Sequence, residues 1–238
     1  MKTETIPLGG SAALTAYLWE PSEELGVEKR PAVLVLPGGA YSMCAQLEGE
    51  PVALAFLAKG FQAFVLRYTT RRQFEPAWND ALAAMDLIRK NAADWQVDAG
   101  RIAVCGFSAG GHLSCALGTM AEQKPRALVL GYPAVVGEDW KHYDLEMVDM
   151  LSKVDENTPP TFLFACRDDD ELPVHDATRL AAALERHGVD FECHIFRRGG
   201  HGFGLGVSPA GYAPAQRRQA RVSAWFELAV SWLKETMG

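Results

Sequence analysis

The chain has 238 residues and a formal net charge of −7, and 48% of its residues are hydrophobic. This length and apolar content suit a large buried core, and we expect residues 1–238 to form a single α/β domain. Because a nucleic-acid surface needs a basic patch, the acidic balance argues against a nucleic-acid partner, and we interpret the scattered arginine pairs at 71–72, 197–198 and 217–218 as solvated side chains.

Apolar runs and turn residues predict strands that alternate with helices along the chain. Two antiparallel edge strands are expected at 3–7 and 14–20, and further strands at 31–36, 61–68, 101–105, 127–131, 161–166 and 190–196. Helices are expected at 50–59, 76–94, 108–120, 173–187 and 214–234. Residues 132–160 form an irregular segment, the only possible lid. This order predicts a mostly parallel central sheet with antiparallel N-terminal edge strands and helices on both faces.

The run Gly106-Phe-Ser-Ala-Gly110 lies where the 101–105 strand should end and a helix should begin. A strand, a sharp turn and a helix around Gly-x-Ser-x-Gly form a nucleophile elbow, in which the serine hydroxyl stands above the sheet. The two glycines allow the strand and the helix to approach closely. A plain glycine-rich turn with a bystander serine is the alternative, so Ser108 needs partner residues to count as a nucleophile.

A serine hydroxyl needs a base, which is usually a histidine. Among six histidines, His201 follows the last predicted strand in a glycine-rich loop, and sites in open α/β sheets form at the carboxyl ends of strands. His112 on the elbow helix should pack against neighbouring loops. Structural roles are also expected for the other four, His142, His175, His187 and His194.

The acid that orients the histidine should lie between the serine and the histidine in sequence. Strand 161–166 is followed by the four acidic residues 168–171, most of which we interpret as a solvated loop. One aspartate should turn inward. The spacing leaves Asp169 and Asp168 both open.

Attack on an ester places negative charge on the carbonyl oxygen, and a single pre-aimed N–H donor typically accounts for a factor of about 10² to 10³ in rate. Ala109, next to the serine, should supply one N–H. Gly39 and Ala40, in the loop after strand 31–36, should supply the others. Tyr41, Trp78 and Trp140 could offer aromatic surface to a sugar, although packing is the commoner role of such residues.

The N-terminal residues lack the apolar region of a secretory signal peptide, and no apolar run in the sequence is long enough to span a membrane. Five cysteines, without a Cys-x-x-Cys pair, favour reduced thiols, so we expect a cytoplasmic protein without a membrane partner. The absence of a His-x-x-x-His pattern or a cysteine cluster implies no metal and no organic cofactor. The oligomeric state is left open.

With these parts in place, the chain resembles the α/β-hydrolase superfamily, and within it the small carbohydrate acetylesterases of the acetylxylan-esterase-like group. The matching segments are Leu36-Pro-Gly-Gly-Ala-Tyr-Ser42, Glu48-Gly-Glu-Pro-Val-Ala53, Gly106-Phe-Ser-Ala-Gly-Gly-His112, Thr158-Pro-Pro-Thr-Phe-Leu163, Asp169-Asp-Glu-Leu-Pro173 and Gly199-Gly-His-Gly-Phe-Gly204.

The resemblance implies an α/β-hydrolase fold with Ser108 as nucleophile, His201 as base and Asp169 as acid. Asp169 is implied because the family's aspartate precedes a Val-Pro pair by three residues, here Leu172-Pro173. Where the family usually has a third glycine, this chain has Ala40, whose N–H remains available.

The activity implied is a serine carboxylesterase that removes acetyl or other short acyl groups from sugars or oligosaccharides through an acyl-enzyme. Two alternatives stay open. A serine peptidase of the prolyl-oligopeptidase type shares the elbow and the Asp-x-x-(Val/Leu)-Pro spacing, but usually carries a large extra domain. A catalytically inactive binding member of the fold is the other, and the presence of all three triad candidates argues against it.

Overall fold

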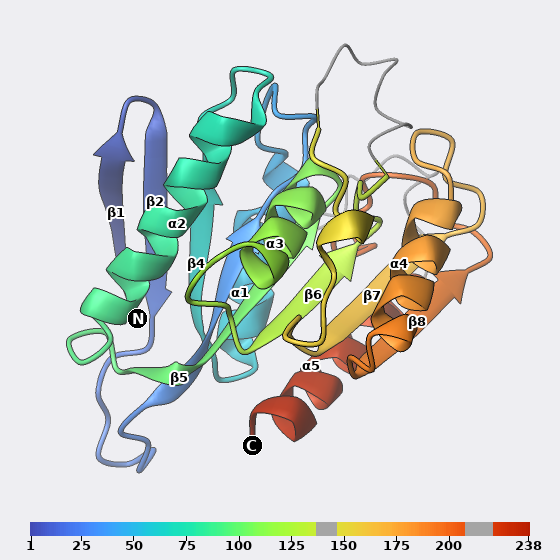
Figure 1. Cartoon of the computed structure of the whole chain (residues 1–238). Coiled ribbons are helices and arrows are strands. Elements are labelled where there is room, and N and C mark those ends of the chain that lie inside the picture. The colour runs from blue at the N-terminus through green and yellow to red at the C-terminus, as the bar shows by residue number, and fades with distance from the viewer. Residues whose placement is uncertain (137–146, 208–220) are drawn as a thin grey trace.

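The computed structural model describes residues 1–136, 147–207 and 221–238. One eight-stranded sheet runs through it in the order β1-β2-β4-β3-β5-β6-β7-β8 (Figure 1). The strands are β1 (Lys2–Gly9), β2 (Ala12–Leu18), β3 (Arg30–Leu36), β4 (Gln62–Arg67), β5 (Val97–Phe107), β6 (Ala127–Gly131), β7 (Thr161–Cys166) and β8 (Phe191–Phe196). Strand β2 pairs antiparallel with β1 and β4, and the other pairs are parallel, which confirms the predicted sheet.

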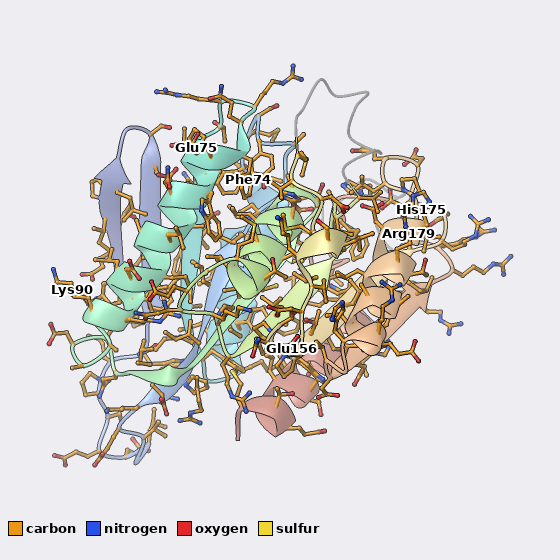
Figure 2. All side chains as sticks on the ribbon, in the orientation of Figure 1. Phe74, Glu75, Lys90, Glu156, His175 and Arg179 are labelled. Atoms are coloured by element: carbon orange, nitrogen blue, oxygen red, sulfur yellow. The ribbon has the colours of Figure 1, made fainter. Side chains whose placement is uncertain are left out.

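Helices cover both faces of the sheet, as predicted (Figure 1). Helices α1 (Glu50–Ala58) and α5 (Ala224–Met237) lie on one face, and α2 (Phe74–Lys90), α3 (Ala109–Thr119) and α4 (His175–Arg186) lie on the other. Charged residues such as Lys90 of α2, Arg179 of α4 and Glu156 in the turn before β7 are exposed, whereas Phe74 points inward from the first turn of α2 (Figure 2).

The closing helix is shorter at its start than the sequence suggested. Helix α5 begins at Ala224 rather than at residue 214, because residues 221–223 form a turn. Residues 214–220 of the expected helix lie outside the described part of the chain. The helix then continues to Met237, three residues beyond the predicted end at Lys234.

The central strands are buried on both faces, which explains their unbroken apolar runs. All residues of β6 and β7 are buried, and the Trp225 ring of α5 stacks on Phe164 of β7 with 4.3 Å between ring centroids. Because β3, β5, β6, β7 and β8 are parallel, the loops that follow them meet at one edge of the sheet. This edge holds the candidate site.

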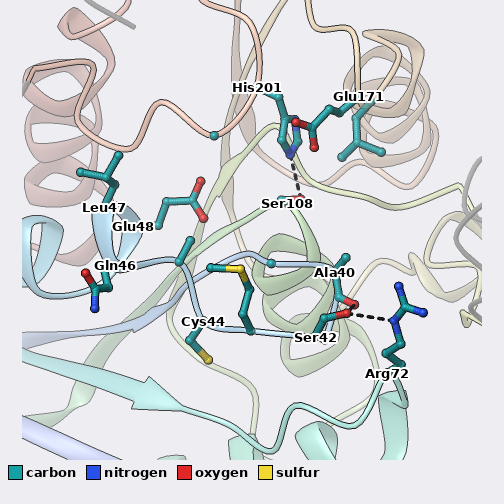
Figure 3. Close-up of a pocket in the computed structure, with 15 residues that line it drawn as sticks. Ala40, Ser42, Cys44, Gln46, Leu47, Glu48, Arg72, Ser108, Glu171 and His201 are labelled. Carbon is teal, nitrogen blue, oxygen red and sulfur yellow. Dashed lines mark hydrogen bonds between the residues drawn. The ribbon is translucent and has the colours of Figure 1, made fainter. Parts of the chain in front are cut away.

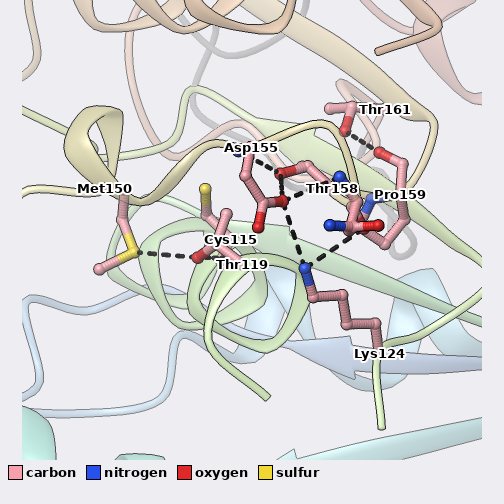
Figure 4. A network of polar contacts seen from close by, with 9 residues as sticks. Cys115, Thr119, Lys124, Met150, Asp155, Thr158, Pro159 and Thr161 are labelled. Carbon is pink, nitrogen blue, oxygen red and sulfur yellow. Dashed lines mark hydrogen bonds and ion pairs between the residues drawn. The ribbon is translucent and has the colours of Figure 1, made fainter. Parts of the chain in front are cut away.

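The end of the irregular segment 132–160 is fixed against the core. Met150 is fully buried and its N–H donates to the Val135 carbonyl oxygen (3.1 Å). The Lys124 ammonium group contacts the Asp155 carboxylate (3.4 Å) and the Asn157 carbonyl oxygen (3.2 Å) (Figure 4). The centre of the segment, 137–146, lies outside the described residues, so the lid stays a prediction. In the described parts of the chain, no helix combines the length and the apolarity needed to cross a bilayer.

Candidate active site

Ser108 lies in the turn between β5 and α3, with the unusual backbone angles φ 51° and ψ −119°. A Cβ atom added to Gly106 would collide with the Gly110 carbonyl oxygen, and one added to Gly110 would collide with the Leu36 carbonyl oxygen. Only glycine therefore fits at either position, as the elbow motif predicts. The turn is held by a hydrogen bond from the Ser108 N–H to the Gly131 carbonyl oxygen (3.0 Å).

The His201 imidazole lies between Ser108 and Asp169. Its Nδ1 is 2.8 Å from Asp169 Oδ2. Its Nε2 is 2.9 Å from Ser108 Oγ (Figure 3). An ionised carboxylate can only accept hydrogen bonds, so His201 Nδ1 carries a hydrogen and donates a hydrogen bond to Asp169. The unprotonated Nε2 then accepts a hydrogen bond from the Ser108 hydroxyl. This tautomer is the one in which a histidine can deprotonate a serine.

The Asp169 carboxylate is itself fixed by its own loop. Its Oδ1 accepts the N–H groups of Glu171 (3.0 Å) and Leu172 (2.8 Å), which leaves Oδ2 for His201. The Asp169 side chain is 1% exposed and the His201 side chain 8%. The structure thus brings Asp169, rather than Asp168, to the histidine.

Burial and charge act in opposite directions on His201. Burial, the largest single effect, lowers its pKa because the charged form loses solvent. The hydrogen bond and charge of Asp169, followed by the charges of Glu171 and Glu48, raise it. The net result is a pKa above the ordinary 6.5.

The loop after β3 carries two of the three expected N–H donors. Gly39 (φ 126°) and Ala40 (φ 50°) both adopt positive φ and line a cleft of about 660 Å³ together with Ser108 and His201. Ala109 is the first residue of α3 and is buried. Among the described residues, none accepts a hydrogen bond from the N–H of Gly39, Ala40 or Ala109. The three amides are therefore available to a ligand oxygen.

The expected aromatic surface for a sugar is not formed by Tyr41 or Trp78. The Tyr41 side chain is 1% exposed and its hydroxyl lies 2.8 Å from His112 Nδ1, so the ring belongs to the core. Trp78 is partly buried and stacks on Phe74 within α2, and it is not among the described residues that line the cleft. Trp140 lies outside the described residues.

His112 has the structural role that was predicted for it. Its Nε2 donates to the Val148 carbonyl oxygen (2.8 Å), and its Nδ1 accepts the Tyr41 hydroxyl. Burial lowers its pKa to about 4, so the ring is neutral at pH 7. Three other histidines lie at the start of α4 (His175), at its end (His187) and within β8 (His194), while His142 is outside the described residues.

Three further residues at the site were not identified from the sequence. Arg72, interpreted as solvated, lines the cleft, and its Nε donates to Ser42 Oγ (3.1 Å) (Figure 3). Glu48 also lines the cleft, although it is 2% exposed. Tyr132 follows β6 and its ring centroid is 4.8 Å from that of His201. Its position at the carboxyl end of a strand is the signal that could have identified it.

The candidate site does not resemble a metal centre. Within residues 1–136, 147–207 and 221–238, no group of three His, Cys, Asp or Glu side chains is arranged to hold a metal ion. The five cysteines are free thiols. What the arrangement can do is transfer a proton from a serine hydroxyl and bind an oxyanion.

Two family models match adjacent parts of the chain. The BD-FAE family matches residues 19–131, and the prolyl oligopeptidase family matches residues 136–238. Among curated proteins, an acetylxylan esterase from Xylanibacter ruminicola is 27% identical over 74% of this chain and 42% of its own length. The chain spans only 36% to 42% of the length of the curated relatives it matches.

Solved structures match over nearly the whole chain. The α/β-hydrolase MGS-M1 from a Medee basin deep-sea metagenome library has a TM-score of 0.93 and 35% identity, with 100% of this chain and 98% of that one covered. An acetyl ester-xyloside bifunctional hydrolase from Caldicellulosiruptor lactoaceticus has a TM-score of 0.83 and 30% identity, with 97% and 92% covered.

Proposed function

The chain belongs to the α/β-hydrolase family, and from this premise we propose that it is a serine carboxylesterase that hydrolyses acetyl or similarly short acyl esters of sugars or oligosaccharides. The observation that carries this proposal is the hydrogen-bonded line from Ser108 through His201 to Asp169. The similarity of the chain to an acetylxylan esterase and to an acetyl ester-xyloside bifunctional hydrolase supports the acetyl and sugar parts of the proposal.

In the proposed mechanism, Ser108 Oγ attacks the ester carbonyl carbon while its proton passes to His201 Nε2. The N–H groups of Gly39, Ala40 and Ala109 bind the oxyanion. The tetrahedral intermediate then collapses, and His201 gives its proton to the departing alcohol. Water, deprotonated by His201, attacks the acyl-serine and releases the carboxylic acid and free Ser108.

The experiment that tests the nucleophile compares Ser108→Ala with the parent protein on p-nitrophenyl acetate. We expect a loss of at least about 10³ in kcat. In parallel, an organophosphonate should form an adduct on Ser108, found by peptide mass spectrometry. A folded protein that remains unlabelled would favour the inactive, binding member of the fold.

A peptidase is the second candidate, because the prolyl oligopeptidase family matches residues 136–238. Ester and amide substrates separate the two functions. We expect p-nitrophenyl acetate to be turned over much faster than an aminoacyl-p-nitroanilide, and the reverse order would identify a peptidase. Acyl esters of increasing length and acetylated xylo-oligosaccharides, tested beside acetylated monosaccharides, would then define the acyl limit and the alcohol.

The same proposal extends to organisation and location. Ser108 lies in the range matched by one family model and Asp169 and His201 in the range matched by the other, so we take residues 1–238 as one catalytic domain. The five free thiols support a reducing, cytoplasmic location. The net charge of −7 supports a small-molecule ester rather than a nucleic acid as partner.

A further inference from the structure

Glu48 is a buried carboxylate beside the candidate site, and the mechanism above does not use it. It ends a short 3₁₀ helix (Gln46–Glu48) that precedes α1. Its Oε2 accepts the N–H of Gly38 (2.8 Å) and its Oε1 accepts the hydroxyl of Tyr132 (2.6 Å). Burying a carboxylate is costly unless it is hydrogen-bonded, and these contacts offset part of that cost.

These two contacts lead to the two loops that carry the proposed chemistry. Gly38 precedes Gly39 and Ala40, and its own N–H donates to Glu48, whereas the N–H groups of the next two residues have no acceptor among the described residues. The Tyr132 hydroxyl also accepts the N–H of Gly204 (3.1 Å), in the loop that carries His201. Glu48 therefore bridges the two loops through Tyr132.

The carboxylate is also close to Ser108. A Cβ atom added to Gly38 would lie 2.7 Å from Glu48 Oε2 and 2.8 Å from Ser108 Cβ. The side chains of Glu48 and Ser108 therefore approach each other across Gly38, where no side chain intervenes. A Cβ atom at Gly202, next to His201, would lie 3.9 Å from Glu48 Oε1. The Glu48 carboxylate is thus close both to the serine and to the loop that carries the histidine.

Within the described part of the chain, the charged groups that act on His201 come from two loops. Asp169 and Glu171 come from the acidic loop and Glu48 from the segment before α1, while the neutral Tyr132 follows β6 and the neutral Ser108 lies in the elbow. Burial first, and then the Glu48 charge, raise the pKa of Tyr132 well above 10, so this hydroxyl stays protonated and donates to Glu48. Both oxygens of Glu48 accept hydrogen bonds, from Gly38 N–H and from the Tyr132 hydroxyl, and this arrangement favours the charged form of the carboxylate.

We propose that Glu48 is a positioning residue that holds the oxyanion loop and the His201 loop in register and whose negative charge stabilises the imidazolium formed when Ser108 passes its proton to His201. This inference rests on the proposed function. Glu48 touches no reacting atom and acts through Gly38, Tyr132 and the field at His201. An electrostatic contribution of this kind is realised mainly in the transition state, so it should affect kcat more than KM.

The test is Glu48→Gln, which keeps the shape of the side chain and removes its charge. On p-nitrophenyl acetate we expect kcat to fall about 10-fold or more with little change in KM. The acid limb of the kcat/KM–pH profile should move to lower pH, because the lost charge no longer raises the pKa of His201. A merely structural role would lower the amount of folded enzyme and leave that limb in place.

The matched control is Glu50→Gln, two residues along at the start of α1, where the carboxylate pairs with Arg67 of β4 and does not line the cleft. This variant should behave like the parent protein. Tyr132→Phe is a second test, which removes the hydroxyl that joins the two loops and keeps both the Glu48 carboxylate and the ring packing on His201. It should lower kcat without moving the acid limb to lower pH.

Two outcomes would overturn the proposal. One is a Glu48→Gln enzyme with the kcat and pH profile of the parent protein, and the other is a Tyr132→Phe enzyme with full kcat. Loss of activity in Ser108→Ala, measured beside them, separates these results from a failure of the proposed function. If Ser108→Ala remained active, the esterase mechanism itself would fail.

Discussion

Asp168 and Asp169 are consecutive, yet their carboxylates hold different parts of the site. Asp169 Oδ2 accepts the Nδ1–H of His201 at 2.8 Å. Asp168 Oδ1 instead accepts the backbone N–H groups of Gly199 (2.9 Å) and Gly200 (3.0 Å), just before the histidine. One carboxylate orients the imidazole, and its neighbour ties down the loop that carries it.

This division of roles predicts unequal effects of removing each charge. Asp169→Asn should lower kcat by about 10⁴, because the amide no longer selects the tautomer in which Nε2 is free to accept. Asp168→Asn keeps an oxygen that can accept both N–H groups, so we expect a loss of at most about 10-fold. The measurement is kcat on p-nitrophenyl acetate for both variants.

Asp168→Ala, which removes the acceptor altogether, is the control for the loop contact. It should lower the free energy of unfolding by about 1–2 kcal/mol as well as kcat. If Asp168→Asn were the crippled variant and Asp169→Asn were active, the acid would have been assigned to the wrong residue.

The raised pKa of His201 predicts the acid limb of the pH profile. The histidine must be neutral to accept the serine proton, so kcat/KM should fall as the pH drops through its pKa, which lies above 6.5. In Asp169→Asn, the limb should move to lower pH, since the main effect that raises this pKa is gone. An acid limb centred well below pH 6.5 in the parent protein would mean that the Asp169, Glu171 and Glu48 charges do not outweigh the effect of burial on the pKa of His201.

The elbow was predictable because its determinants are local. Gly106 and Gly110 lie within two residues of Ser108, and the close contact between Gly106 and the Gly110 carbonyl oxygen arises within the turn itself. The order of strands and helices was predictable for the same reason, because apolar periodicity is a property of short windows. His201 needed one further rule, the position of sites at the carboxyl ends of strands.

The errors and omissions involve contacts between distant residues. Tyr41 lies in a glycine-rich loop, a context that suggested exposure, but its φ of 53° and its contact with His112, 71 residues away, place the ring in the core. Glu48 and Tyr132 are 84 residues apart and meet only because of the strand order. No local pattern distinguishes Arg72, at the cleft, from the other arginine pairs.

The depressed pKa of His112 predicts a stability loss in mild acid. Its folded-state pKa is about 4 and its ordinary value 6.5, so only the unfolded chain binds the proton between these pH values. The free energy of unfolding should therefore fall as pH drops from 6.5 to 4, by on the order of 2 kcal/mol from this residue. Urea unfolding of the parent protein and His112→Gln at several pH values measures this contribution as the difference between them.

The parent protein and the His112→Gln variant must be compared because His201 affects the pH dependence in the opposite direction. The raised pKa of His201 gives a stabilisation that is present below pH 6.5 and is lost as the pH rises through the folded-state pKa. His187→Gln, at the exposed end of α4, is the control and should keep the parent pH dependence. A His112→Gln variant with the same pH dependence as the parent protein would mean that the buried ring does not resist protonation.

The positive φ of Ala40 predicts that glycine is tolerated there. An alanine in the left-handed region costs about 1–2 kcal/mol, and glycine relieves this but loses about 0.5–1 kcal/mol through the greater freedom of its unfolded state. For Ala40→Gly (φ 50°) we expect kcat within about threefold of the parent value, since the N–H remains, and an unchanged or slightly higher free energy of unfolding.

Ala45→Gly is the matched control in the same loop. Its φ of −67° is ordinary for alanine, so the substitution should destabilise by about 0.5–1 kcal/mol. Equal destabilisation of Ala40→Gly and Ala45→Gly would show that the backbone is not strained at Ala40. A loss of kcat above about 10-fold in Ala40→Gly would mean that the alanine methyl group, and not only its amide, acts on the substrate.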